Sequence, residues 1–124
     1  MIMEIPAVNE LPPDNARPYK FVQFEVNGNP YMRTAQQPSY HTDIVAEFCR
    51  EIECKTYEDN RKIYPRDPAV TLVGAGFIYK GGNVYYYGGR SASYRITPDN
   101  THMEKIAALF PENRFVFDEF VELR

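Results

Sequence analysis

The stretch YKFVQFEVNGNPYMRT, residues 19–34, decides the fold of this chain. Apolar side chains alternate along residues 19–26, which is the pattern of a β-strand with at least one buried face. Asn27 and Gly28 follow, and an Asn-Gly pair between two such runs is a strong signal for a tight hairpin turn. Residues 30–34 then form the return strand. The sequence therefore predicts an antiparallel strand pair at this place.

The segment after this hairpin is expected to be an amphipathic helix. Between residues 44 and 52, apolar side chains recur at the spacing of one helix face. Ser39 is a suitable N-cap, because its hydroxyl can accept a hydrogen bond from a free N–H group of the first turn. His41 then lies in that first turn, partly exposed, beside the positive end of the helix dipole.

The middle of the chain is expected to be a loop followed by more strands. Residues 55–68 are polar and interrupted by proline, which is typical of a long loop. Residues 69–89 predict strands around a tight Lys-Gly-Gly-Asn turn. Gly74 and Gly76 lie inside one of these strands, and glycines there indicate a bulge or a close approach of the backbone to another group.

A second helix and a last strand complete the expected domain. Asn100 or Thr101 would cap the helix, and NRFVFDEFVEL, residues 113–123, would be the closing strand. Residues 1–17 contain three prolines and no sustained period, so they are expected to form an extended arm. A chain of 124 residues fits one domain, here residues 18–124. These features together predict an α/β fold.

The composition limits the classes of partner. The net charge of −3 argues against a broad nucleic-acid surface, which would need a basic excess. Tyr85 and Tyr87 could stack on single-stranded bases, but half-buried strand residues are the better account in an acidic chain. No apolar run is long enough to span a membrane, and the first residues do not resemble a secretory signal. A cytoplasmic protein is therefore expected.

The cysteines and histidines give no pattern for a metal site. Cys49 and Cys54 can form a disulfide, although free thiols in a reducing compartment are the preferred interpretation. The two histidines are far apart in the sequence and lie at no metal-ligand spacing from the two thiols. We therefore expect neither a metal nor another cofactor.

The segment GGRSASY, residues 88–94, has glycines next to small hydroxyl residues. This composition is typical of a loop whose backbone N–H groups approach an anion. Taken alone, this segment is better explained as a flexible loop, and His41, Lys20 and Arg33 as ordinary surface residues. The residues by themselves indicate an α/β domain that could bind an anion.

Read together, several segments resemble the phosphohistidine phosphatase family, also called the Janus/Ocnus family. YKFVQFEV is similar to its first strand, which begins with an aromatic-Lys pair, and YHTDI at residues 40–44 is similar to its Tyr-His-x-Asp-Ile motif. Arg33 stands eight residues before the histidine, as the family's arginine does. GAGFI, VYYYGGRSASY and MEKIAALFPENRFVF resemble later family segments in the same order, so the resemblance runs from about residue 18 to about residue 119.

The resemblance implies a compact domain with a mixed β-sheet and two α-helices packed on it. It also implies a metal-independent enzyme that removes phosphate from a histidine-phosphorylated protein, and we expect this enzyme to be a monomer. The family's catalytic histidine would be His41, and its phosphate-binding lysine and arginine would be Lys20 and Arg33. The loop that wraps the phosphate would contribute residues of the segment 88–93, namely Arg90, Ser91, Ala92 and Ser93.

The expected chemistry leaves several alternatives open. A neutral His41 could attack phosphorus directly, which is the preferred mechanism, or act as the general base for water. Phe77 stands where the family has an arginine, and Arg90 could supply that charge. Either Arg90 or Ser91 could occupy the place of the family's serine. The main alternative to an enzyme is an inactive family member that binds phosphorylated or acidic partners.

Overall fold

The predicted hairpin is present and forms one edge of a larger sheet. The computed structural model describes residues 1–124. Its elements in chain order are β1 (Tyr19–Val26), β2 (Asn29–Ala35), α1 (His41–Glu51), β3 (Thr56–Asp59), β4 (Lys62–Pro65), β5 (Val70–Gly81), β6 (Val84–Gly88), α2 (Asn100–Ala107), β7 (Arg114–Phe117) and the short 3-10 helix η1 (Val121–Leu123).

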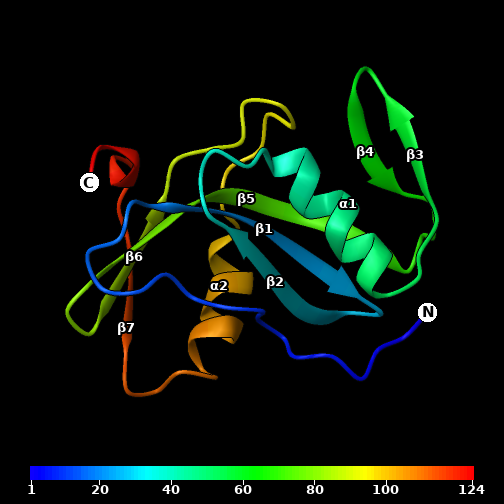
Figure 1. Cartoon of the computed structure of the whole chain (residues 1–124). Helices are drawn as coiled ribbons and strands as arrows, with labels where there is room; N and C mark the ends of the chain where they lie inside the picture. The colour runs from blue at the N-terminus through cyan, green and yellow to red at the C-terminus, as the bar shows by residue number, and fades with distance from the viewer.

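The main sheet has five strands in the order β2-β1-β5-β6-β7 (Figure 1). Its first four strands pair antiparallel, and β7 pairs parallel to β6. The connection between β6 and β7 contains α2, as a parallel pair requires a crossover. The sheet is therefore mixed, and the expected α/β fold with a mixed sheet and two helices is confirmed.

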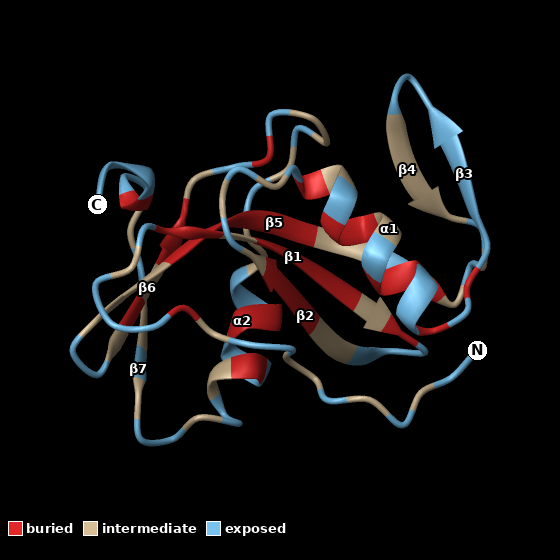
Figure 2. Cartoon of the chain, viewed as in Figure 1, coloured by how far each residue is buried: buried red, intermediate tan, exposed pale blue.

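The two helices cover opposite faces of the sheet. Successive side chains of a strand point to opposite faces, so Val22 and Phe24 pack in a cluster with α1 while Phe21 packs in a second cluster with Met103 of α2. Figure 2 shows that the buried residues concentrate in the central strands and on the helix sides that face them. His41 lies on the α1 side of this sheet. No helix is both long and apolar enough to cross a membrane.

Residues 55–68 are not a plain loop, because they contain the β3–β4 hairpin, which stands apart from the main sheet (Figure 1). The rings of Tyr57 and Tyr64 stack across the two strands, with centroids 5.4 Å apart. The Tyr94 hydroxyl donates to the Ile63 carbonyl at 2.6 Å, and the Ile63 N–H donates to Thr42 Oγ1 at 3.1 Å. These hydrogen bonds attach the hairpin to the rest of the domain. All residues of β3 are exposed, so the sequence of β3 lacks the apolar alternation that predicts a strand.

Residues 1–17 form no helix or strand, and residues 7–9 of this arm lie along the free edge of β2. Val8 forms a parallel bridge with Met32, whose N–H donates to the Ala7 carbonyl at 2.7 Å. The Asn9 side chain accepts from the Thr34 N–H at 2.9 Å and donates to the Thr34 carbonyl at 3.0 Å. The arm thus satisfies backbone groups that an exposed edge strand would otherwise present.

The two glycines inside β5 behave as expected. The register between β1 and β5 shifts at Gln23, opposite Gly74. A Cβ atom at Gly74 would collide with the Gln23 side chain, and a Cβ atom at Gly76 would collide with the Gly88 carbonyl. The predicted bulge and the predicted close approach are therefore both present.

Candidate active site

A cavity of about 350 Å³ opens at the N-terminal end of α1, between this helix, the sheet and the loop that follows β6. We call it the His41 cavity. It is lined by Lys20, Tyr40, His41, Phe77, Arg90, Ala92, Ser93 and Glu122. The structure therefore brings together five of the expected site residues, which are Lys20, His41, Arg90, Ala92 and Ser93.

His41 is the first residue of α1. The N-cap is Tyr40 and not Ser39, because the Tyr40 N–H donates to the Asp43 side chain at 2.9 Å in a capping box. His41 is 5% exposed, so the expectation of a partly exposed residue is wrong. It is buried because the ring packs edge-on against Phe77 of β5, with centroids 5.7 Å apart.

One nitrogen of the His41 ring is bound and the other is available. Nε2 lies 3.0 Å from the Gly76 carbonyl oxygen, which can only accept, so Nε2 carries the proton of the neutral ring and Nδ1 carries the lone pair. Nδ1 has no hydrogen-bond partner within the protein. Every side-chain nitrogen or oxygen that is buried does have a partner, so Nδ1 is not buried. Nδ1 therefore reaches solvent, and His41 lines the cavity named after it.

The surroundings of His41 favour the neutral ring. Burial lowers the pKa of His41 below its ordinary value of 6.5, and the positive charge of Lys20 lowers it further. The hydrogen bond to Gly76 acts in the opposite direction but is outweighed. The positive end of the helix dipole also disfavours the charged ring, but the largest cause of the lowered pKa is burial.

Lys20 supplies an unpaired positive charge to the cavity. It stands on β1 opposite Phe77 of β5, on the face covered by α1. Its Nζ lies 5.2 Å from the centre of the Tyr40 ring and 6.0 Å from that of Phe77. No carboxylate forms an ion pair with it. The ammonium group is therefore available to an anion.

The loop after β6 gives Arg90, Ala92 and Ser93 to the cavity but not Ser91. The Ser91 N–H donates to the Ile96 carbonyl at 2.9 Å, and its carbonyl accepts from the Arg95 N–H at 2.8 Å. Ser91 is fully buried, and its Oγ accepts from the Tyr94 N–H at 3.2 Å. Ser91 thus stabilises the conformation of the loop and does not contact the cavity. Arg90 lines the cavity, is exposed and makes no ion pair.

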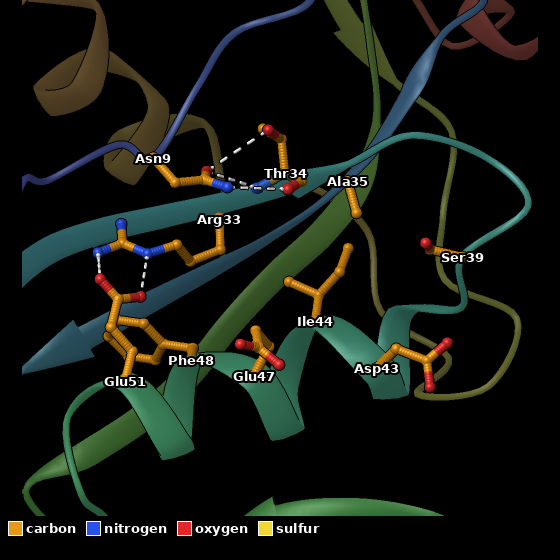
Figure 3. A pocket seen from close by; sticks show the side chains of 10 residues that line it. All are labelled: Asn9, Arg33, Thr34, Ala35, Ser39, Asp43, Ile44, Glu47, Phe48 and Glu51. Atoms are coloured by element: carbon orange, nitrogen blue, oxygen red, sulfur yellow. Dashed lines mark hydrogen bonds and ion pairs between the residues drawn. The ribbon is translucent and has the colours of Figure 1, made fainter.

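Arg33 is not part of this site, contrary to expectation. Its guanidinium group binds the Glu51 carboxylate with two hydrogen bonds of 2.8 and 3.0 Å (Figure 3). The remaining donors bind the carbonyls of Pro6, Ala7 and Met32.

The position of Arg33 follows from the strand register and the length of α1. Arg33 pairs with Val22 on β1 and meets the C-terminal end of α1, where Glu51 is the last residue. His41 lies ten residues earlier in the helix, about 15 Å away at 1.5 Å per residue. Eight residues of sequence separation therefore do not bring Arg33 beside His41.

Glu122 lines the cavity although it was not expected to. Residues 113–123 are not one strand, because β7 ends at Phe117 and η1 follows. Asp118 Oδ1 accepts from the Phe120 N–H at 3.0 Å and turns the chain. An Asp whose side chain can bond the backbone two residues later is a turn signal. That signal was present in the sequence but was hidden in an apolar run.

The chain has no group of three or more His, Cys, Asp or Glu side chains that could hold a metal ion. Cys49 and Cys54 are both free and buried. No model of a known protein family matches this chain, and no match is found among curated protein sequences. The resemblance to phosphohistidine phosphatases therefore rests on the motifs in the sequence.

Proposed function

We propose that this protein is a cytoplasmic protein-histidine phosphatase that hydrolyses the N–P bond of phosphohistidine. The observation that carries the proposal is the free Nδ1 of a buried His41, in a cavity that also contains two unpaired cations. Lys20 and Arg90 are these cations. The mechanism requires neither a metal nor another cofactor, because these two side chains provide the positive charge.

In the first step, His41 Nδ1 attacks phosphorus. The nitrogen lone pair forms the new N–P bond. The substrate ring is protonated on its other nitrogen, so it takes the electron pair of the old bond and leaves as neutral imidazole. The Gly76 carbonyl accepts a hydrogen bond from Nε2–H. This bond keeps the proton on Nε2 and orients the ring, so that Nδ1 is the nucleophile. Water then attacks phospho-His41, which releases inorganic phosphate and regenerates neutral His41.

Lys20 and Arg90 stabilise the charge that the equatorial phosphoryl oxygens carry during both steps. Phosphoryl transfer depends mainly on positioning and on such charge stabilisation. Arg90 takes the role expected of Arg33, and its planar guanidinium group can bind two oxygens at once. The same residues serve the alternative mechanism, in which His41 takes a proton from water and no phospho-His41 forms.

The test is hydrolysis of a phosphohistidine-bearing protein, with a phosphoserine peptide as the control. We expect phosphate release from the first substrate and little from the second. Rapid acid-free quenching with a labelled substrate separates the two mechanisms, because only direct attack transfers label to the enzyme. Binding of vanadate without any hydrolysis would assign the protein to the alternative class, a non-catalytic module for phosphorylated partners.

A further inference from the structure

The C-terminal turn is held firmly against the end of β6. Gly88 has no side chain, and a Cβ atom there would collide with the Asp118 carbonyl. The Arg124 guanidinium donates to Asp118 Oδ2 at 2.9 Å and stacks on the Tyr86 ring at 3.8 Å. Val121 is fully buried and anchors η1. The backbone at Glu122, between Val121 and Arg124, is therefore held in place on both sides, while Glu122 itself is exposed.

The Glu122 carboxylate reaches the His41 cavity beside Gly89. A Cβ atom at Gly89 would lie 2.6 Å from Glu122 Oε1 and 3.1 Å from the Phe77 ring, which in turn packs against His41. Gly89 has a φ of +69°, a conformation that favours glycine. Glu122 makes no ion pair, although Arg90 lines the same cavity.

A carboxylate is unfavourable for binding a phosphoryl dianion, since like charges repel. It is favourable for a substrate that carries a positive charge next to phosphorus. An N–P bond breaks readily when the leaving imidazole is protonated on its other nitrogen, because the ring can then leave as a neutral molecule. An O–P ester has no such cation. The cavity therefore contains the charges for both halves of a protonated phosphoramidate.

We propose that Glu122 is a specificity-determining residue that selects N–P over O–P substrates by pairing with the protonated leaving group. This inference rests on the proposed function of the His41 cavity. Glu122 stabilises the imidazolium form of the bound phosphohistidine, and His41 Nδ1 attacks phosphorus. The P–N electron pair returns to the leaving ring, which departs as neutral imidazole with its remaining N–H beside the carboxylate.

The test compares kcat/KM on phosphohistidine and on p-nitrophenyl phosphate, which has an O–P bond and an anionic leaving group. Glu122→Gln should lower kcat/KM on phosphohistidine by about tenfold, since an opposite charge at close range stabilises a cation by at least that factor. The value on p-nitrophenyl phosphate should stay constant or rise. Glu122→Lys should enlarge both changes. Glu119→Gln is the matched control, because Glu119 lies outside the His41 cavity, and it should leave both values unchanged.

The outcomes separate this inference from the proposed function. If the parent protein hydrolyses phosphohistidine and Glu122→Gln keeps the same ratio between the two substrates, the role of Glu122 is wrong and the phosphatase stands. An equal loss on both substrates also overturns selectivity. If the parent hydrolyses neither substrate, the proposed function fails and this inference fails with it.

Discussion

The two histidines of this protein have the same surroundings in almost every respect. Each lies in the first turn of a helix, each is buried, and burial lowers the pKa of each. Each bonds a strand carbonyl through Nε2, His41 to Gly76 at 3.0 Å and His102 to Phe24 at 2.9 Å. They belong to α1 and α2, which cover opposite faces of one sheet.

The difference is at the second ring nitrogen. Nδ1 of His102 lies 3.1 Å from Gln23 Nε2, which also donates to the Asp99 carbonyl at 3.0 Å. His102 is therefore saturated and joins a helix to the sheet, whereas Nδ1 of His41 remains free. Burial and a lowered pKa are common to a structural and a candidate catalytic histidine, so neither property identifies a site. What distinguishes His41 is a free lone pair in a cavity with unpaired cations.

The largest expected effect tests this difference directly. His41→Ala should lower kcat on a phosphohistidine substrate by about 10³-fold or more, because the nucleophile or base is removed. It should also cost about 1–3 kcal/mol of stability, because the Gly76 carbonyl loses its partner in a buried place. The measurements are initial rates and urea unfolding of the same preparation.

A His41→Gln variant is the control for stability, since an amide can still donate to Gly76. We expect it to recover part of the lost stability and none of the rate. Parental rates in either variant would show that His41 is structural, like His102, and would remove the proposed mechanism.

The second prediction compares two arginines. Arg33→Ala should lower the free energy of unfolding by about 3 kcal/mol, because it leaves Glu51 and the carbonyls of the arm without their donor. Vanadate affinity of the folded variant should change little. Arg90→Ala should do the reverse, weakening vanadate binding with almost no loss of stability, because Arg90 is exposed and unpaired. Weakened vanadate binding in folded Arg33→Ala would return Arg33 to the site.

These arginines also show which parts of the molecule could be predicted from the sequence. The strand pair, both helices and the glycine close contacts follow from local patterns, and the structure has them. Arg33 is different, because eight residues of spacing say nothing about whether a side chain meets the beginning or the end of α1. The role of Ser91 and the approach of Glu122 likewise depend on contacts between segments far apart in the sequence. The β3–β4 hairpin could not be predicted from apolar alternation, because every residue of β3 is exposed and every residue of β4 is partly buried.

His102 provides the third and smaller effect. His102→Ala should cost about 2 kcal/mol of stability, because the Phe24 carbonyl and the Gln23 amide lose a buried partner. The rate on phosphohistidine should remain close to that of the parent below the melting temperature, since His102 is on the other face of the sheet. Urea unfolding and initial rates are measured as for His41→Ala. A rate loss as large as that of His41→Ala would break the distinction between the two residues.

The smallest effects are in the response to pH and phosphate. Both histidines have a pKa below 6.5 in the folded protein, so the unfolded chain binds more protons in acid. The stability from their neutral forms is fully present above pH 6.5 and is lost as the pH falls through the folded values. Ring proton shifts followed by NMR should therefore give two low pKa values in buffer without phosphate.

Inorganic phosphate should raise the pKa of His41, because a bound anion favours imidazolium, and should leave that of His102 unchanged. Equal responses of the two rings would mean that the His41 cavity does not hold the anion.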